Sequence, residues 1–130
     1  MSKTIGLIDD SKVMRSILRK SILMCNYKVD EFMEAENGEE GFDLLSGKQD
    51  QLDIAFVDLH MPKVGGLEML TKLKSEGTVS VPIVIVSTSA DMEMQKKCLE
   101  LGAVGFIRKP FTPQDVGTLM EKIVGEADPA

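Results

Sequence analysis

The sequence predicts an α/β protein with one parallel sheet between two layers of helices. Along its 130 residues, five short apolar runs alternate with five segments of helical periodicity. Strands joined in this way need right-handed crossovers, which make the strands parallel and place helices on both faces of the sheet. The clearest run, residues 54–57, is apolar throughout and is followed by Asp58, as expected for a strand covered on both faces.

The composition is that of one ordinary globular domain. The chain is 43% hydrophobic and 28% charged, and it contains no repeat or linker. We expect a single domain over residues 1–130, with a core from about 3 to 125 and a frayed tail from Glu126. The net charge of −6 and the lack of a Lys/Arg run exclude the basic patch that nucleic-acid binding needs.

The N-terminal residues lack the basic start and apolar core of a signal peptide, and no apolar run is long enough to cross a membrane. Cys25 and Cys98 both fall in helical patterns without metal-ligand spacing. We therefore expect a cytoplasmic protein without membrane insertion, in which both cysteines are reduced core thiols.

The first strand is predicted over residues 4–8. Ser11 is a good N-cap for a helix over residues 12–25, and Asn26 is a plausible stop. Six apolar residues of this helix recur at helical spacing: Val13, Met14, Ile17, Leu18, Ile22 and Cys25.

The second strand, residues 27–34, alternates more weakly, which suggests the sheet edge. A short helix then opens at Asn37-Gly38 and closes near Gly47.

After the strand at 54–57, Pro62 turns the chain. Gly65-Gly66 then offers two positions that can adopt positive φ before a helix that ends at Gly77.

The fourth strand follows Pro82 over residues 83–86 and stops at 87–89. A helix over residues 92–101 is closed by Gly102.

The fifth strand, residues 104–107, is broken by Lys109-Pro110, and Thr112-Pro113 caps the last helix. One face of that helix carries Val116, Leu119, Met120, Ile123 and Val124.

Polar residues collect where the predicted strands end, and in a parallel sheet these ends share one edge. They are Asp9, Asp10, Asp58, Ser87, Thr88 and Lys109. If the first and third strands are neighbours, three carboxylates meet there, and two of them about 4 Å apart repel by about 4 kcal/mol. Lys109 would relieve part of this repulsion, and Mg²⁺, which prefers hard oxygen ligands, would relieve the rest. Taken alone, Asp9-Asp10 would be read as a charge pair at a helix N-terminus.

In this order, the motifs resemble the receiver domain of two-component response regulators in its single-domain, CheY-like form. The acidic pair is Asp9-Asp10, and the segment Asp-Leu-His-Met-Pro-Lys-Val-Gly-Gly from Asp58 resembles the phosphoacceptor motif. Lys109-Pro110 matches the lysine and proline of the family. The likeness covers residues 3–125 and implies a flavodoxin-like (βα)5 fold, a doubly wound parallel five-stranded sheet in the order 2-1-3-4-5.

The resemblance also implies roles for the residues at the sheet edge. Asp58 would accept a phosphoryl group from a phosphohistidine. Mg²⁺ would be held by Asp58, by Asp10 directly, by Asp9 mainly through water, and by the backbone carbonyl of His60. Lys109 would stabilise the charge on the phosphoryl oxygens, and the Lys109–Pro110 bond would be cis.

The same resemblance predicts a switch made of Ser87 and Phe106. Ser87 would sense the phosphoryl group, and Phe106 would rotate to alter the surface of the fourth helix, fifth strand and fifth helix. Thr88 is the other candidate for the hydroxyl, and spacing from Pro82 and Lys109 favours Ser87. The side chain of His60 is read as a loop group that tunes hydrolysis or docking.

The expected function is that of a signalling receiver that assists its own phosphorylation and dephosphorylation and is not otherwise an enzyme. Its partners would be a sensor histidine kinase or a histidine phosphotransfer protein, together with a downstream protein: a flagellar switch, a phosphorelay or an enzyme. A receiver-fold interaction or phosphorelay module without its own output is the main alternative.

Two other classes of protein fit less well. A flavin-binding flavodoxin needs a Ser/Thr/Gly-rich phosphate loop after the first strand, where this chain has Asp9-Asp10-Ser11. An aspartyl-phosphate phosphatase needs a second Asp two residues after the nucleophile, where this chain has His60.

Overall fold

A computed structural model describes residues 2–48, 50–77, 80–88 and 92–127. Strands and helices alternate along the chain, in agreement with the predicted order. The strands are β1 (Lys3–Ile8), β2 (Val29–Ala35), β3 (Ile54–Asp58), β4 (Ile83–Ser87) and β5 (Gly105–Arg108). The helices are α1 (Lys12–Met24), α2 (Gly38–Lys48), α3 (Gly66–Ser75), α4 (Met92–Glu100) and α5 (Pro113–Val124).

All strand pairs are parallel, and the sheet order is β2-β1-β3-β4-β5, which confirms the predicted flavodoxin-like topology. The weakly patterned β2 lies at one edge, as its alternation suggested, and β5 lies at the other. β3 and β4 contain only buried residues, because neighbouring strands flank them and helices cover both faces.

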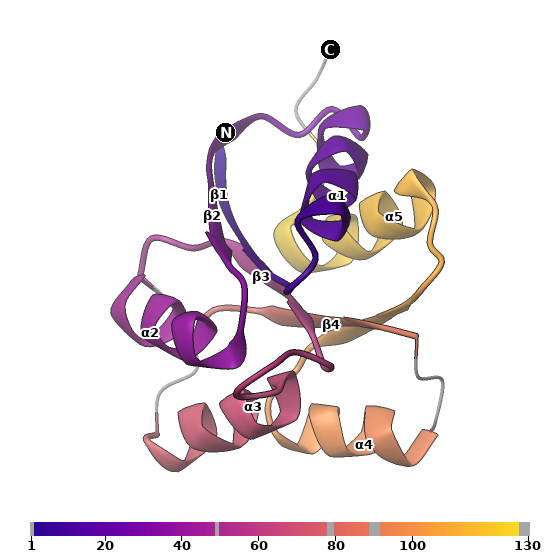
Figure 1. The fold of residues 1–130 in the computed structure, drawn as a ribbon. Helices are drawn as coiled ribbons and strands as arrows, with labels where there is room; N and C mark the ends of the chain where they lie inside the picture. The colour runs from indigo at the N-terminus through magenta and orange to yellow at the C-terminus, as the bar shows by residue number, and fades with distance from the viewer. Residues whose placement is uncertain (1, 49, 78–79, 89–91, 128–130) are drawn as a thin grey trace.

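Helices α1 and α5 cover one face of the sheet, and α2, α3 and α4 cover the other (Figure 1). Each layer has its own apolar core. On the first face, Leu18 and Ile22 of α1 and Val116 and Met120 of α5 pack against the strands. On the second, Leu45, Met69, Leu70, Leu73 and Cys98 do so.

The apolar pattern of α1 is only partly buried. Leu18 and Ile22 are covered, but Val13 is 69% and Ile17 is 42% exposed. The six apolar positions of the pattern occupy a wider arc than the contact with the sheet and α5, so the outer members of the arc face solvent.

The predicted helix caps are confirmed. The Ser11 side chain accepts a hydrogen bond from the backbone N–H of Met14 at the start of α1. At the start of α5, Thr112 and Asp115 form a reciprocal capping box, with Pro113 in the first turn. Asn26 has φ 67° immediately beyond α1.

The prediction for Gly65-Gly66 was wrong in its physical reason. Gly65 has φ −77°, and Gly66 does not adopt positive φ; the left-handed residue of this loop is Lys63, with φ 65°. Glycine is needed at position 66 because a Cβ there would lie 2.4 Å from the carbonyl oxygen of Asp58. The loop after β3 therefore packs directly against the end of that strand.

Within the described residues, no helix is both long and apolar enough to span a bilayer. Cys25 and Cys98 are free thiols, and burial raises the pKa of Cys98. Of the tail predicted to fray, Ala127 packs against the layer of α1 and α5, and residues 128–130 lie outside the described residues.

Candidate functional site

Three carboxylates meet at the carboxyl ends of β1 and β3. Asp9 directly follows β1 and Asp58 ends β3, and the two strands are paired neighbours. One carboxylate oxygen from each of Asp9, Asp10 and Asp58 lies within 4.8 Å of the others. Asp9 is 1% and Asp58 6% exposed, whereas Asp10 is exposed. The predicted juxtaposition is present, and we call this cluster, together with Lys109, the acidic pocket.

Lys109 brings a cation to these carboxylates from the end of β5. Its Nζ lies 3.3 Å from Asp9 Oδ2 and 3.5 Å from Asp58 Oδ1. Its backbone N–H donates to the carbonyl of Ser87 at 2.9 Å, which ties the loop after β5 to the end of β4. The Lys109–Pro110 bond is cis, as predicted.

The pKa of Asp58 is raised, mainly because the carboxylate is buried. Burial raises the pKa of Asp58 most, Lys109 opposes the rise, and Asp9 and Asp10 add to it. A hydrogen bond from the backbone N–H of His60 acts with Lys109 to lower the pKa. The net result is a raised pKa, so one lysine does not compensate the buried carboxylate.

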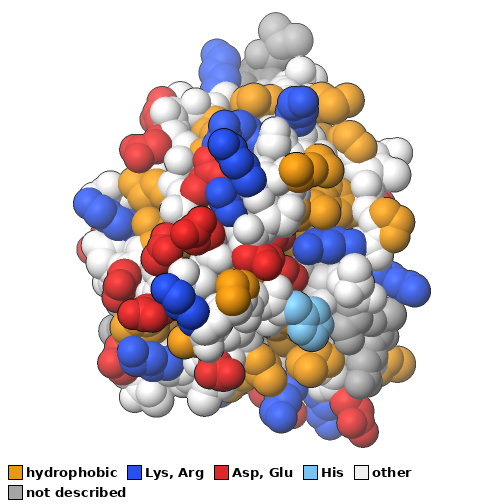
Figure 2. All heavy atoms as spheres, viewed as in Figure 1, with side chains coloured by type: hydrophobic (Ala, Val, Ile, Leu, Met, Phe, Trp, Pro, Cys, Tyr) orange, Lys and Arg blue, Asp and Glu red, His pale blue; other side chains and the backbone are white. Residues whose placement is uncertain are grey.

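The donor set suits a hard divalent cation. Three carboxylates with oxygens this close supply the ligands that Mg²⁺ prefers, and their exposure on the Asp10 side leaves room for coordinated water. His60 lies in the loop after β3, and its side chain is exposed. Figure 2 shows this histidine, the single one in the chain, near acidic groups on the surface.

The two residues predicted to form a switch lie on neighbouring strands. Ser87 ends β4, is fully buried and follows Val86, which pairs with Asp58 in the sheet. Thr88 comes next and is exposed. Phe106 lies in β5, where it pairs with Ile85 and is half-buried. The sheet thus places Ser87 at the rim of the acidic pocket and Phe106 farther along the next strand.

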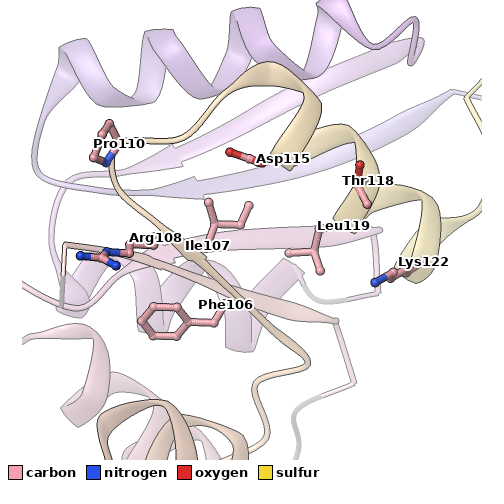
Figure 3. Close-up of a pocket in the computed structure, with 8 residues that line it drawn as sticks. All are labelled: Phe106, Ile107, Arg108, Pro110, Asp115, Thr118, Leu119 and Lys122. Atoms are coloured by element: carbon pink, nitrogen blue, oxygen red, sulfur yellow. The ribbon is translucent and has the colours of Figure 1, made fainter. Parts of the chain in front are cut away.

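A groove lies between β5 and α5, beyond the pocket (Figure 3). Its volume is about 430 Å³. The residues that line it come from the end of the chain: Phe106, Ile107, Arg108, Pro110, Asp115, Thr118, Leu119 and Lys122. Leu119 points from α5 toward β5 and packs against Gly105. The resemblance predicted an output surface over the fourth helix, fifth strand and fifth helix, with Phe106 as its switch residue. Arg108 and Lys122, which also line this groove, were not singled out from the sequence.

Sequence reasoning also missed a contact behind the pocket. Arg15 of α1 donates from Nη1 to the backbone carbonyl of Asp9 at 2.6 Å, and from Nε to Glu34 of β2 at 2.8 Å. No local pattern links residues 15 and 34, because only the pairing of β1 with β2 brings them together. The spacing of Arg15 from Ser11, one turn along α1, was the available signal that its side chain could reach back to the loop.

Comparison with known proteins agrees with this geometry. The family model described as "Response regulator receiver domain" matches residues 5–121. A chemotaxis protein CheY homolog of Campylobacter jejuni is 32% identical over 120 residues, which are 92% of this chain and 90% of that protein. Chemotaxis protein CheY1 of Helicobacter pylori is 29% identical over 123 residues, 94% of this chain and 97% of that protein.

Solved structures show the same fold. The phosphorylated cyanobacterial phytochrome response regulator RcpA superposes with a TM-score of 0.81 at 24% identity, covering 98% of both chains. A chain of the CheX–CheY–BeF3–Mg complex of Borrelia burgdorferi gives a TM-score of 0.82 at 21% identity, with 94% of this chain and 89% of that chain covered.

Members of this family are signalling domains of two-component systems rather than conventional catalytic enzymes. The family match over residues 5–121, the CheY relatives and the shared strand order together establish what the chain is. This chain belongs to the response regulator receiver domain family, and its CheY-like receiver domain carries a magnesium-compatible acidic cluster.

Proposed function

We propose that the protein is a phosphoacceptor response regulator, in which Asp58 takes a phosphoryl group from the phosphohistidine of a sensor histidine kinase or a histidine phosphotransfer protein. The observation that carries the proposal is the position of Asp58. Its carboxylate is nearly buried at a strand end, within 4.8 Å of two other carboxylates and 3.5 Å from Lys109 Nζ.

In the transfer step, an Asp58 carboxylate oxygen attacks phosphorus, the new P–O bond forms, and the P–N bond to histidine breaks. The imidazole leaves with the electron pair of that bond and becomes neutral after taking up a proton. Lys109 offers an ammonium to the phosphoryl oxygens, and such positioning and charge stabilisation account for most of the catalysis of phosphoryl transfer. In the separate dephosphorylation step, water attacks phosphorus and gives up a proton to solvent, the P–O bond to Asp58 breaks, and inorganic phosphate leaves.

Mg²⁺ would be held by Asp10 directly, Asp9 mainly through water, Asp58, and the backbone carbonyl of His60. Bound there, the ion would neutralise charge between the carboxylates and the incoming phosphoryl group. The close carboxylate oxygens support this assignment, because they bring three acidic groups together against one lysine.

The signal would leave through the surface of α4, β5 and α5. The Ser87 hydroxyl gains a phosphoryl oxygen as a new acceptor, and Phe106 on the next strand adjusts to its movement. Two observations support this route. Ser87 directly follows Val86, which pairs with Asp58 in the sheet, and the backbone N–H of Lys109 donates to the Ser87 carbonyl. The groove between β5 and α5 then offers a downstream protein an apolar floor with Arg108 and Lys122 beside it.

Phosphorylation with acetyl phosphate and Mg²⁺, followed by intact-mass measurement, tests the proposal. We expect wild type to gain one phosphoryl group and Asp58→Asn to gain none. Asp30→Asn is the matched control, since Asp30 is an exposed aspartate of β2 outside the acidic pocket. Undiminished labelling of Asp58→Asn would show that another residue is the acceptor.

A second measurement addresses the output surface. Proteins retained by the immobilised receiver are compared with and without beryllofluoride, an acyl-phosphate mimic. We expect retention of the downstream partner to increase with the mimic and to fall in Lys122→Glu, which reverses a charge in the groove. Equal retention in all four cases would exclude this surface as the exit of the signal.

A further inference from the structure

The loop between β1 and α1 carries two of the three carboxylates, yet the sheet holds only its first residue. The backbone N–H of Asp9 donates to the carbonyl of Ala35 in β2 at 3.0 Å. Pairing of β1 with β3 ends at Ile8 and Val57, so the Asp9 carbonyl lies beyond that ladder. The orientation of the peptide that joins Asp9 to Asp10 must therefore be determined by other contacts.

Arg15 supplies such a contact. Its Nη1 donates to the Asp9 carbonyl at 2.6 Å, a short distance typical of a charged donor. A second contact orients the Asp9 side chain: the backbone N–H of Ser11, two residues later in the loop, donates to Asp9 Oδ1 at 2.9 Å. The Asp9 carbonyl and the Asp10 N–H belong to the same planar peptide unit. Holding the carbonyl therefore also sets the orientation of the Asp10 backbone, from which the Asp10 side chain projects.

Glu34 anchors Arg15 in turn. Arg15 Nε donates to Glu34 Oε1 at 2.8 Å, and the Arg15 side chain is only 12% exposed. Glu34 pairs with Leu7 in the sheet, so its backbone is held by β1 itself. A planar guanidinium that donates from two nitrogens to two fixed acceptors is held in one orientation, which a lysine could not reproduce.

Arg19, one turn further along α1, provides the comparison within the same helix. Its Nη2 also contacts Glu34, at Oε2, and its guanidinium lies 5.3 Å from the centre of the Phe32 ring. Its side chain is 42% exposed. Arg19 thus shares the Glu34 carboxylate with Arg15, whereas the contact to the Asp9 carbonyl comes from Arg15.

We propose that Arg15, anchored by Glu34, is a positioning residue that presents the Asp9 and Asp10 carboxylates to the metal ion. The inference rests on the proposed function, because it takes these two carboxylates as ligands of Mg²⁺. It adds a link between the pocket and the edge strand β2, on the side of the pocket opposite the link that Lys109 makes to β4 and β5.

The test is titration of the unphosphorylated protein with Mg²⁺ alone, in wild type, Arg15→Met and Arg19→Met. Groups that orient metal ligands typically contribute about 10-fold or more to metal affinity, so we expect Arg15→Met to bind Mg²⁺ about 10-fold more weakly. Arg19→Met removes an equal charge from the same helix and should bind Mg²⁺ within about twofold of wild type, since exposed charges interact weakly.

Conservative variants separate positioning from a loss of packing. Arg15→Lys keeps the positive charge but lacks the planar guanidinium that donates from two nitrogens. We therefore expect it to recover only part of the Mg²⁺ affinity lost in Arg15→Met. Glu34→Gln leaves Arg15 in place with a weaker anchor, and its affinity should fall between those of wild type and Arg15→Met. Thermal unfolding of each variant establishes that the titrated protein is folded.

A second readout needs no metal. In the metal-free protein, the backbone amide resonances of Asp10 and Ser11 should shift in Arg15→Met and stay near their wild-type positions in Arg19→Met. Unchanged resonances in Arg15→Met, or equal losses of Mg²⁺ affinity in both variants, would overturn the inference. If wild type itself binds no Mg²⁺, the proposed metal site fails, and this role of Arg15 fails with it. Wild-type affinity in Arg15→Met overturns the inference about Arg15 alone.

Discussion

In the acidic pocket, Asp9 and Asp58 are 1% and 6% exposed and only Asp10 is open to solvent, whereas the groove between β5 and α5 is lined mainly by half-buried and exposed side chains. The pocket carries three carboxylates against one lysine, and the groove mixes apolar side chains with charges of both signs. A short path joins the two regions. The backbone N–H of Lys109 donates to the carbonyl of Ser87 at the rim of the pocket, and the chain neighbours of Lys109, Arg108 and Pro110, line the groove.

The difference shows where charge has a strong effect in this molecule. Buried carboxylates interact strongly, because little water screens them, so the pocket responds to a cation or a phosphoryl group. Exposed charges such as Arg108 and Lys122 contribute little free energy by themselves, but they can select a partner of opposite charge. Chemistry therefore suits the closed region, and recognition suits the open one.

The largest expected effect is on the metal site itself. Asp10→Ala should abolish measurable Mg²⁺ binding, because it removes the directly coordinating carboxylate, while Asp9→Ala should weaken binding less. Titration of the metal-free protein with Mg²⁺ measures both affinities. If neither substitution changes the affinity, the carboxylates do not form a metal site, and the contrast between pocket and groove loses its basis.

The next effect concerns the backbone under the pocket. Gly66→Ala would place a Cβ 2.4 Å from the Asp58 carbonyl oxygen, so the loop after β3 must move, at a cost of about 2–3 kcal/mol in the free energy of unfolding. Gly47→Ala is the matched control, since a Cβ added there would have no atom within 4 Å apart from its chain neighbours and the adjacent backbone of α2. That change in α2 should stabilise the protein by about 0.5–1 kcal/mol. Urea denaturation measures both, and equal effects would contradict the close contact.

A smaller effect comes from the charge of Asp58. Its pKa is raised above the ordinary value of 3.8, so the folded protein holds this proton at a higher pH than the unfolded chain does. Stability is therefore lost as pH rises from 3.8 through the folded-state pKa. Without metal at pH 7, Asp58→Asn should therefore be more stable than wild type.

The gain in stability should shrink as the pH is lowered toward 3.8 and below it, because Asp58 of the wild type becomes protonated in both the folded and the unfolded state only below that pH. Denaturation in the presence of a chelator, at pH 7 and near pH 4, measures the change. A variant that is less stable at pH 7, or a difference that does not depend on pH, would show that Lys109 compensates the carboxylate after all.

The smallest effect tests the path between the two regions. Ser87→Ala should still accept a phosphoryl group on Asp58, but the resulting structural change in β5 and α5 should be weak. The variant loses the hydrogen bond from the Ser87 hydroxyl to the phosphoryl group, which is worth about 1 kcal/mol. Amide chemical-shift changes on adding beryllofluoride, compared at Phe106 and Leu119 in wild type and Ser87→Ala, measure the transmission. Thr88→Ala is the control, since Thr88 is exposed. Equal changes in wild type and Ser87→Ala would show that Ser87 is not the relay.

Local sequence patterns were sufficient for the elements and for the identity of the polar residues at the sheet edge. The run at 54–57 is apolar at every position, and the structure buries all of β3. Ser11 and Thr112-Pro113 are capping signals that act within one turn of the helix they start, so they could be read without knowing the fold.

The exposure of Val13 and Ile17 could not be predicted in the same way. Periodicity shows that α1 has an apolar side, but only the packing of α5 and the sheet decides how much of that side is covered. The requirement for glycine at position 66 could not be predicted either, because the close approach to the Asp58 carbonyl depends on the path of the whole loop.

The sequence by itself determined the carboxyl end of each strand to within one residue, since β-propensity and apolar runs are local properties of the chain. Only the tertiary structure decided which of these ends are neighbours. The order β2-β1-β3-β4-β5 places Asp9 beside Asp58, brings Lys109 to both, and puts Glu34 within reach of Arg15. Such contacts join residues up to 100 positions apart, and they depend on how the strands pair and on how the layers of helices settle against them.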